Sequence, residues 1–353
     1  MNYLTKPRKS NSMPKGIPYI IGNELAERFS FYGMKCILII FMTQYLINDN
    51  HVLDPMSDTE ATKWYHLFTS AVYFTPIFGA LLSDVFIGKF KTMKQFAVIG
   101  DPIAHSLSPI LHQEVYRQLD LDASFEKIHL MPNALHSFMN VNELDGFNVT
   151  IPYKQSVIPF LDELDESAQT IGAVNCVHDG KGYNTDWIGF TKAMEQNGIS
   201  LNGKDYIILG SGGAARAIAF GLVQFGAKSI SIKNRTQSKA DKLLHWINSI
   251  FPNNNSSENS DVIVNCTPLG MWPDTESMPD LEIKKGQILA DTVYNPLKTK
   301  WLTTREKKGA KTIGGLDMFI GQGLASADIW FGEKISEKIK LEPIKKVLKS
   351  ELC

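Results

Sequence analysis

A glycine-rich turn lies between an apolar run and a candidate helix in the second half of the chain. Gly210-Ser211-Gly212-Gly213-Ala214-Ala215 follows the apolar run 206–209 and matches the pattern G-x-G-x-x-A. In this context the glycines allow a tight turn and the close approach of a pyrophosphate, which N–H groups at the start of the helix can bind. The turn therefore predicts a dinucleotide site, and the alternative is a tight strand–helix turn that holds no ligand.

The end of the next candidate strand indicates which dinucleotide would bind. The run 229–233 is followed by Asn234-Arg235-Thr236, with Lys239 one turn later. NAD-binding proteins commonly place an acidic side chain here for the ribose 2′-hydroxyl, whereas a planar guanidinium suits a 2′-phosphate. We therefore expect NADP rather than NAD. The alternative is that Arg235 and Lys239 belong to a solvated basic surface.

Four earlier segments carry polar side chains beside the ends of candidate strands. They are Ser106-Leu-Ser108-Pro109, Asn148-Val-Thr150-Ile-Pro-Tyr-Lys154, Gly172-Ala-Val-Asn175 and Asn184-Thr-Asp186. Taken alone, each has a structural explanation, such as a helix start, a turn cap, a surface lysine or a helix N-cap. Taken together, a lysine ammonium beside a carboxylate can hold an oxygen on which negative charge develops and then donate a proton to it.

Strands that alternate with helices must position these residues. Apolar runs predict strands over 96–100, 124–130, 145–151, 206–209 and 229–233, with further strands near 176, 262 and 288. Periodic segments predict helices over 108–119, 134–139, 186–198, 316–332 and 343–352. This alternation predicts an α/β fold with a parallel, doubly wound arrangement. The expected units are a substrate-binding lobe over 93–192, completed by 315–353, and a Rossmann NADP-binding lobe over 193–314.

Composition excludes several classes of protein. The chain has 353 residues, 44% of them hydrophobic, with 36 Lys and Arg against 37 Asp and Glu. These values exclude a disordered chain and give no electrostatic reason to expect nucleic acid as a partner. The cysteines at 36, 176, 266 and 353 lack the spacing of a zinc site or a disulfide framework. We therefore expect free thiols, a reducing compartment and no metal.

The first 92 residues differ from the rest. Apolar stretches over 17–46 and 67–88 flank an acidic loop, and basic residues stand outside them at Lys6, Arg8, Lys9, Lys15, Lys89, Lys91 and Lys94. This pattern predicts a transmembrane-like helical hairpin with both ends in the cytoplasm. A secretory signal peptide is the first alternative, which the long apolar run and the missing cleavage site disfavour, and a buried soluble helix is the second.

The same segment resembles a transporter family. GNELAERFSFYGM, which contains Glu24, Glu27 and Arg28, and FTPIFGALLSDVFIGKFKT resemble the first two helices of proton-coupled oligopeptide transporters. In that family the two glutamates and the arginine take part in proton coupling. The resemblance covers about residues 17–92, two helices of the dozen or more that the family needs. It implies a fusion whose residues 17–88 could tether the chain to a membrane, and we expect Met93 to begin a self-sufficient enzyme.

Nine segments after Met93 resemble the shikimate dehydrogenase family, in the family's order. They are AVIGDPIAHSLSP, GFNVTIPYK, IGAVNCV, GYNTDWIGF, the glycine turn, NRT, VNCTPLGM, DTVYNP and GGLDMFIGQG. The resemblance implies a two-lobed cytoplasmic enzyme that reduces 3-dehydroshikimate to shikimate with NADPH, on the route to chorismate and aromatic amino acids. The same motifs permit a quinate/shikimate dehydrogenase of broader specificity. A membrane peptide-transport component is a third reading, and a homodimer stays open.

The resemblance also implies roles for individual residues. Lys154 and Asp186 match the family's catalytic pair, and hydride attack on a ketone creates the oxygen charge that such a pair can neutralise. The implied substrate contacts are Ser106 and Ser108 to the carboxylate, Thr150, Asn175, Asp186 and Gln322 to the ring hydroxyls, and Tyr294 across the pocket. The implied cofactor contacts are Gly210, Ser211, Gly212, Gly213, Ala214, Asn234, Arg235, Thr236, Lys239, Thr292 and Gly315.

Overall fold

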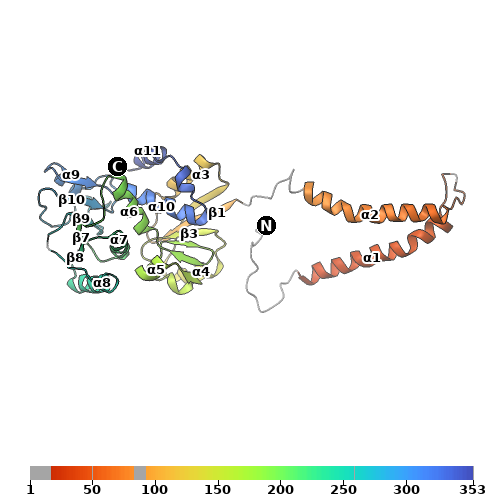
Figure 1. The fold of residues 1–353 in the computed structure, drawn as a ribbon, viewed down its shortest axis with the longest axis horizontal. Coiled ribbons are helices and arrows are strands. Elements are labelled where there is room, and N and C mark those ends of the chain that lie inside the picture. The colour runs from red at the N-terminus through yellow and green to blue at the C-terminus, as the bar shows by residue number, and fades with distance from the viewer. Residues whose placement is uncertain (1–16, 50, 83–92, 258, 353) are drawn as a thin grey trace. The chain divides into compact units, whose positions relative to one another are not determined.

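The computed structural model describes residues 17–49, 51–82, 93–257 and 259–352. The chain divides into two compact units, Met1–Thr92 and Met93–Cys353. In the first unit, helices α1 (Ile17–Gln44) and α2 (Asp58–Leu82) lie side by side (Figure 1). The connection between them is closed by a bridge between Ile47 and Leu53.

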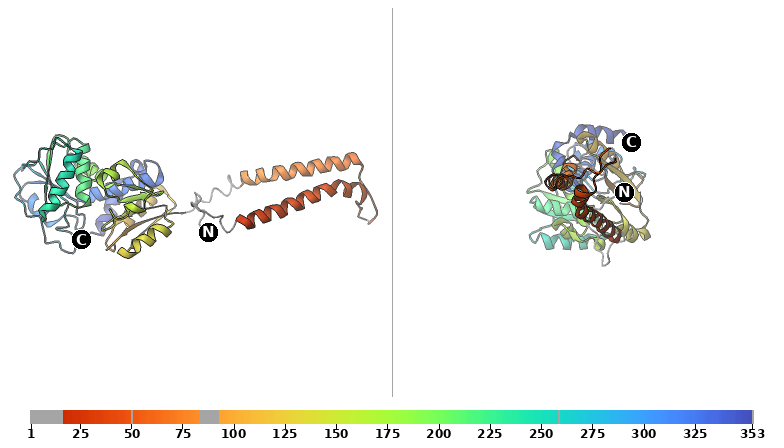
Figure 2. Two further views of the ribbon diagram at one scale, coloured as in Figure 1. Left: turned by 90° about the horizontal axis from the view of Figure 1, so that it is seen from below. Right: turned by 90° about the vertical axis from the view of Figure 1, so that its right-hand side faces the viewer.

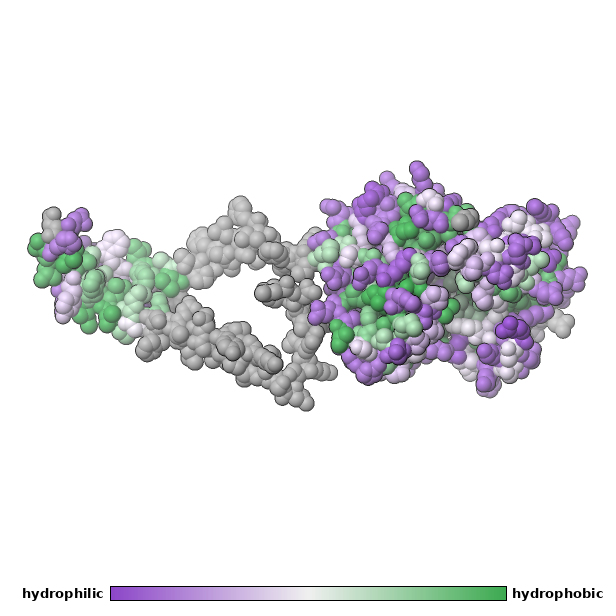
Figure 3. Space-filling view, turned by 180° about the vertical axis from the view of Figure 1, so that it is seen from behind, coloured by the Kyte–Doolittle hydropathy of each residue, from purple (hydrophilic) through white to green (hydrophobic). Residues whose placement is uncertain are grey.

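Much of the described surface of this helical unit is apolar (Figure 3). Ile37 and Phe41 on α1 are 62% and 48% exposed, and Trp64, Leu67 and Phe74 on α2 are exposed by more than half. Among the side chains of this unit whose burial the structure describes, Met42 and Ala61 are buried. The pair therefore buries little apolar surface of its own within its described residues.

The expectation of a transmembrane hairpin needs a correction. Within the described part of the chain, neither helix contains a run that is long and apolar enough to cross a membrane. For α1 the physical reason is charge, because its sequence includes Glu24, Glu27, Arg28 and Lys35, and charged residues at membrane depth are costly. The predicted basic flanks at 6–15 and 89–91 and the end of the second apolar stretch, 83–88, lie outside the described residues.

The second unit contains two sheets (Figures 1 and 2). The first has the strand order β2-β1-β3-β5-β6-β4. Its strands are β1 (Lys94–Gly100), β2 (Ala123–His129), β3 (Gly146–Val149), β4 (Glu163–Leu164), β5 (Cys176–His178) and β6 (Lys181–Tyr183). β1 pairs in parallel with β2 and β3, but β5 runs antiparallel to β3 and β6. The prediction of a wholly parallel arrangement is therefore wrong for this sheet, because a two-residue turn joins β5 to β6 and permits only an antiparallel pair.

Both faces of the first sheet are covered. The helices of this lobe are α3 (Ser108–Leu119), α4 (Leu135–Val141), α5 (Glu166–Ile171), α10 (Leu316–Phe331) and α11 (Leu341–Ser350). Alternation along β1 divides its side chains, with Phe96 and Val98 in one core cluster and Ala97 and Ile99 in the other. The first cluster includes Trp330 of α10, whose ring stacks on Phe96. A late segment of the chain thus packs against the strands of the early lobe.

The second sheet is parallel throughout, with the order β11-β10-β9-β7-β8. Its strands are β7 (Asp205–Leu209), β8 (Ser229–Lys233), β9 (Val262–Asn265), β10 (Ile288–Asp291) and β11 (Lys311–Ile313). Helices α7 (Gly213–Gln224), α8 (Gln237–Ile250) and α9 (Lys300–Glu306) pack around it. The central strands read as continuous apolar runs because helices bury them on both faces.

Helix α6 (Asp186–Gln196) connects the two lobes and packs against both α7 and α10. Its crossing with α10 is close because glycines stand at the contact. A Cβ built on Gly189 would lie 2.5 Å from the carbonyl oxygen of Met318, and one built on Gly321 would lie 3.0 Å from the Cα of Gly189. The backbones of α6 and α10 therefore touch. The expected lobe border at 192/193 falls inside α6.

Candidate active site

Most of the predicted site residues follow the carboxyl ends of strands. Ser106 and Ser108 follow β1, Thr150 and Lys154 follow β3, the glycine turn at Gly210 follows β7, residues 234–239 follow β8, and Thr292 and Tyr294 follow β10. The carboxyl ends of parallel strands open at the same edge of a sheet, where ligands of α/β proteins bind. Each lobe therefore presents its polar segments at one edge of its sheet.

Lys154 and Asp186 form a direct ion pair. The Nζ of Lys154 lies 2.5 Å from Oδ2 of Asp186, and their side chains are 19% and 9% exposed. Asp186 is the first residue of α6, whereas Lys154 lies in the turns after β3. Such a partly desolvated pair interacts more strongly than a surface ion pair. The lysine keeps enough exposure for a small molecule to reach its ammonium group.

Asn175 holds the other oxygen of the carboxylate. Its Nδ2 donates to Oδ1 of Asp186 at 2.8 Å and lies 3.5 Å from Oε1 of Gln322 on α10. The amide oxygen of Asn175 accepts a hydrogen bond from the backbone N–H of Thr185 at 2.6 Å. Three of the predicted substrate contacts, Asn175, Asp186 and Gln322, are thus brought together by one amide side chain.

Backbone contacts fix the two segments that carry this pair. The N–H of Val174 donates to the carbonyl oxygen of Lys154 at 2.7 Å. Asn184 accepts from the N–H of Asp186 at 3.1 Å, and its own amide donates to the carbonyl oxygen of Ala173 at 2.9 Å. Asn184 and Asn175 near Asp186 therefore satisfy buried backbone groups.

The two predicted carboxylate-binding serines face each other. The hydroxyl oxygens of Ser106 and Ser108 lie 3.2 Å apart, and the N–H of Ser108 points at Ser106 Oγ at 3.3 Å. Ser108 begins α3, with Pro109 in its first turn. Two hydroxyl donors at the start of a helix form a suitable site for an anionic group.

Tyr294 reaches this segment from the nucleotide lobe. Its ring stacks on Phe319 of α10, with the centroids 4.4 Å apart. Burial raises the pKa of Tyr294 to about 12, and a hydrogen bond with the backbone of Leu107 acts in the opposite direction. Leu107 stands between the two serines, so this tyrosine closes over the segment that carries them.

The glycine turn lies next to the ion pair. Gly210 has φ 110°, and a Cβ there would lie 3.0 Å from the carbonyl oxygen of Cys266, so only glycine fits. A Cβ built on Gly213 would lie 3.8 Å from Cδ of Lys154. The structure therefore brings the predicted catalytic lysine of one lobe against the predicted phosphate-binding turn of the other.

The residues present fit a phosphorylated dinucleotide. Space around Gly212 is open, because a Cβ there would meet no atom within 4 Å. α7 starts at Gly213 with no side-chain cap, which leaves its first N–H groups for a ligand. Arg235 and Lys239 are exposed, and neither has an ion-pair partner within the described ranges. These groups would hold the pyrophosphate and the 2′-phosphate respectively.

The remaining predicted cofactor residues follow strands of the same sheet. The Nδ2 of Asn234 donates to the carbonyl oxygen of Thr236 at 2.9 Å, which shapes the loop after β8. A Cβ on Gly315 would lie 2.5 Å from the carbonyl oxygen of Thr292. The backbones of Gly315 and Thr292 are therefore in contact beyond the ends of β10 and β11.

Sequence reasoning named Asn148 within a polar segment but assigned no role to this side chain, which is buried next to the site. Asn148 donates to the carbonyl oxygen of Asn175 at 3.0 Å and to Ser326 Oγ at 2.9 Å, and Ser326 lies 3.2 Å from Thr185 Oγ1. All of these side chains are buried. Only tertiary contacts join β3, α10 and the start of α6, so the one sequence signal is a polar residue inside an apolar run.

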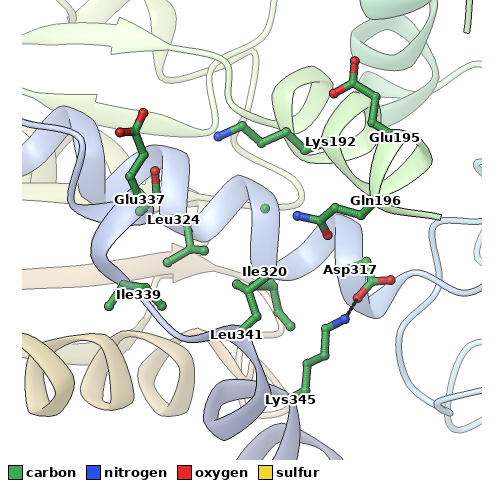
Figure 4. Close-up of a pocket in the computed structure, with 12 residues that line it drawn as sticks. Lys192, Glu195, Gln196, Asp317, Ile320, Leu324, Glu337, Ile339, Leu341 and Lys345 are labelled. Atoms are coloured by element: carbon green, nitrogen blue, oxygen red, sulfur yellow. Dashed lines mark ion pairs between the residues drawn. The ribbon is translucent and has the colours of Figure 1, made fainter. Parts of the chain in front are cut away.

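A cavity of about 330 Å³ lies elsewhere, between α6, α10 and α11 (Figure 4). Ile320, Leu324, Ile339 and Leu341 form its apolar wall, and Lys345 pairs with Asp317 at 2.9 Å. Its lining includes none of the predicted site residues.

Comparisons with known proteins match both lobes. Residues 98–177 match a family model described as the shikimate dehydrogenase substrate binding domain, and residues 206–295 match one described as NADP oxidoreductase coenzyme F420-dependent. A shikimate dehydrogenase (NADP(+)) of Bacillus cereus is 40% identical over 277 residues, which cover 72% of this chain and 99% of that protein. One from Caldicellulosiruptor bescii is 38% identical over 258 residues, covering 68% and 90%.

Solved structures agree. A shikimate dehydrogenase in complex with NADP+ superposes with a TM-score of 0.67 at 34% identity, over 74% of this chain and 96% of that one. The Thermus thermophilus enzyme in complex with NADP(H) and shikimate superposes with a TM-score of 0.65 at 31% identity, over 74% of this chain and 100% of that one. A 5-ketofructose reductase of Gluconobacter superposes with a TM-score of 0.65 at 30% identity, over 74% of this chain and 99% of that one.

Proposed function

The chain belongs to the shikimate dehydrogenase family, and on that premise we propose that it catalyses the reversible NADPH-dependent reduction of 3-dehydroshikimate to shikimate. One observation carries the proposal: the Lys154–Asp186 pair lies against Gly213 of the dinucleotide turn. A proton donor and the site for a hydride carrier thereby lie next to each other, which the reduction of a ketone requires.

The catalytic roles follow from this geometry. When bound, NADPH would supply the hydride that adds to the carbonyl carbon. Lys154 donates a proton to the carbonyl oxygen as negative charge develops there, and in the reverse direction it accepts the proton of the hydroxyl. Asp186 orients the side chain of Lys154 through the ion pair, and its own other oxygen is held by Asn175 at 2.8 Å.

The surrounding residues read the substrate. Ser106 and Ser108 donate to its carboxylate, and Tyr294 covers that end of the pocket. The ring hydroxyls form hydrogen bonds with Thr150, Asn175, Asp186 and Gln322. The fixed donors and acceptors of these side chains discriminate against analogues that lack a hydroxyl. The glycine turn 210–214 and Thr292 with Gly315 hold the dinucleotide, and the loop 234–239 selects the 2′-phosphate through Arg235 and Lys239.

The test is an assay of the purified full chain with shikimate and NADP+, following NADPH formation. We expect turnover that needs both substrates and that falls sharply with NAD+. Quinate is measured in parallel, since comparable rates would identify the broader quinate/shikimate activity. 5-Ketofructose with NADPH is the third arm, because a reductase of that sugar shares the fold. No turnover of shikimate, with turnover of either other substrate, would overturn the proposal.

We also propose that the unit from Met93 to Cys353 is sufficient for activity. Support comes from coverage, since the match with this chain spans 99% of the Bacillus cereus relative but only 72% of the chain itself. Within its described residues the helical unit has two helices, so no transport path is proposed for it, despite its resemblance to transporters. Expression of residues 93–353 alone should give wild-type kcat, and an inactive or insoluble product would contradict this.

A further inference from the structure

We propose that a ring contact between the lobes, His105 on Trp272, couples the dinucleotide site to the carboxylate-binding serines, so that each ligand tightens the binding of the other. The inference rests on the proposed function. It names two residues that lie outside the predicted catalytic and binding set and gives them a positioning role.

The two rings come from opposite lobes. His105 lies in the segment between β1 and α3, directly before Ser106, and Trp272 lies in the loop that follows β9. Their centroids are 4.4 Å apart with the planes at 56°. Both side chains remain exposed, Trp272 by 41%, so burial in a core does not explain the position of this tryptophan. Its ring partner is the segment that presents the serines.

A second contact reinforces the first. The backbone N–H of Trp272 donates to the carbonyl oxygen of Asn295 at 3.0 Å. Asn295 directly follows Tyr294, which hydrogen-bonds with the backbone of Leu107. The nucleotide lobe therefore contacts the serine segment on both sides of Ser106, through Trp272 and Tyr294, and the residue that follows Tyr294 accepts the backbone hydrogen bond of Trp272.

The loop that carries Trp272 starts at the dinucleotide turn. A Cβ on Gly210 would lie 3.0 Å from the carbonyl oxygen of Cys266 and 3.3 Å from Cγ2 of Thr267, so the loop and the turn are in contact. Asn265 fixes the start of the loop, because its Oδ1 accepts from Thr267 Oγ1 at 2.6 Å and its Nδ2 donates to the carbonyl oxygen of Leu269 at 3.3 Å. A ligand held at Gly210 therefore stabilises the loop conformation that places Trp272 on His105.

This arrangement predicts a reciprocal effect. If a bound dinucleotide favours the contact between His105 and Trp272, and this contact orders Ser106 and Ser108, then shikimate binds more tightly to the dinucleotide complex. By linkage, shikimate tightens the dinucleotide by the same factor. Loss of the ring contact should remove this coupling and leave the binding of each ligand alone nearly unchanged.

The experiment measures the Kd of shikimate by calorimetry, without and with saturating NADPH, on the full chain. Both ligands are then in the reduced form, so no turnover occurs. In the wild type we expect NADPH to lower the Kd of shikimate. In Trp272→Ala this factor should fall about two- to tenfold, the range expected for one aromatic contact. Trp272→Phe should restore it, and Met271→Ala, a change at the exposed neighbour, should leave it intact.

His105→Ala completes a double-mutant cycle. The double variant should have the same coupling factor as either single variant, because one contact is lost in all three. Full coupling in Trp272→Ala, additive losses in the double variant, or a wild type without coupling would each overturn the inference. A wild type that neither binds nor turns over shikimate would instead overturn the proposed function, and the activity assay tells the two outcomes apart.

Discussion

Replacement of Lys154 by methionine tests the proton donor while preserving most of the side chain. Methionine keeps the apolar stem that lies near Gly213 but removes the ammonium group 2.5 Å from Asp186. General acid catalysis by a positioned side chain contributes about 10²–10⁴ to the rate. Because Lys154 is 19% exposed, water can reach the position and deliver a proton slowly. We therefore expect a loss of about 10²–10³ in kcat, or about 3–4 kcal/mol in barrier height.

Binding and stability should change less than turnover. Asp186 keeps its hydrogen bond from Asn175 at 2.8 Å, so the contact with the ring hydroxyls persists and KM for shikimate should stay within about fivefold. In Lys154→Met the carboxylate of Asp186, whose side chain is only 9% exposed, loses its cationic partner. Breaking a fully buried pair costs about 3–5 kcal/mol, and partial access of water reduces this to about 1–3 kcal/mol here.

The assay combines steady-state kinetics with urea unfolding, and Lys181→Met is the matched control. Lys181 pairs with Glu163 at 3.4 Å on the surface, so its loss removes a lysine from an exposed pair. The control should keep wild-type kcat and change the free energy of unfolding by less than about 1 kcal/mol. Near wild-type kcat in a folded Lys154→Met variant would refute the assignment of the proton donor.

Three further outcomes are expected. Arg235→Ala should raise KM for NADP+ about tenfold and leave KM for NAD+ unchanged in steady-state assays, since only the 2′-phosphate loses a partner. Asn175→Ala should lower kcat/KM and cost about 1–3 kcal/mol in urea unfolding, because the N–H of Thr185 loses its acceptor. Burial lowers the pKa of His112 from 6.5 to about 3, so the unfolded chain binds a proton that the folded chain does not, and stability falls as the pH drops below 6.5. His112→Phe should remove about 2 kcal/mol of that loss between neutral pH and about pH 5, measured by unfolding at each pH.

Local signals in the sequence predicted much of the second unit. The Ser-Pro start gave a helix over 108–119 that matches α3, and the apolar run, glycine turn and periodic segment gave β7 and α7 in the right places. Helix α8 was missed although its Ala240, Leu243 and Ile247 recur at helical spacing and are buried. β5 and β6 have three residues each, too few for a periodic pattern to show their antiparallel pairing.

The site was predictable to the extent that motifs follow strand ends. Lys154 and Asp186 were paired by resemblance to a family, and the structure brings their atoms together, whereas the roles assigned to them stay predictions until tested. The contact of Asn148 with Ser326, and that of His105 with Trp272, depend on which distant elements pack together. No local pattern encodes such contacts, because they arise only when elements far apart in the sequence pack together.

The touching backbones of α6 and α10 have a consequence for protein engineering. Because no side chain separates Gly189 from Gly321, neither helix can slide without moving the other, and they carry Asp186 and Gln322 as one block. The chain enters and leaves the second sheet just beyond this block, at 197–204 and at 314–315. A chimera can be spliced at those two crossings so that its second sheet comes from a relative. It should have the coenzyme preference of that relative and keep this chain's selectivity for the substrate ring.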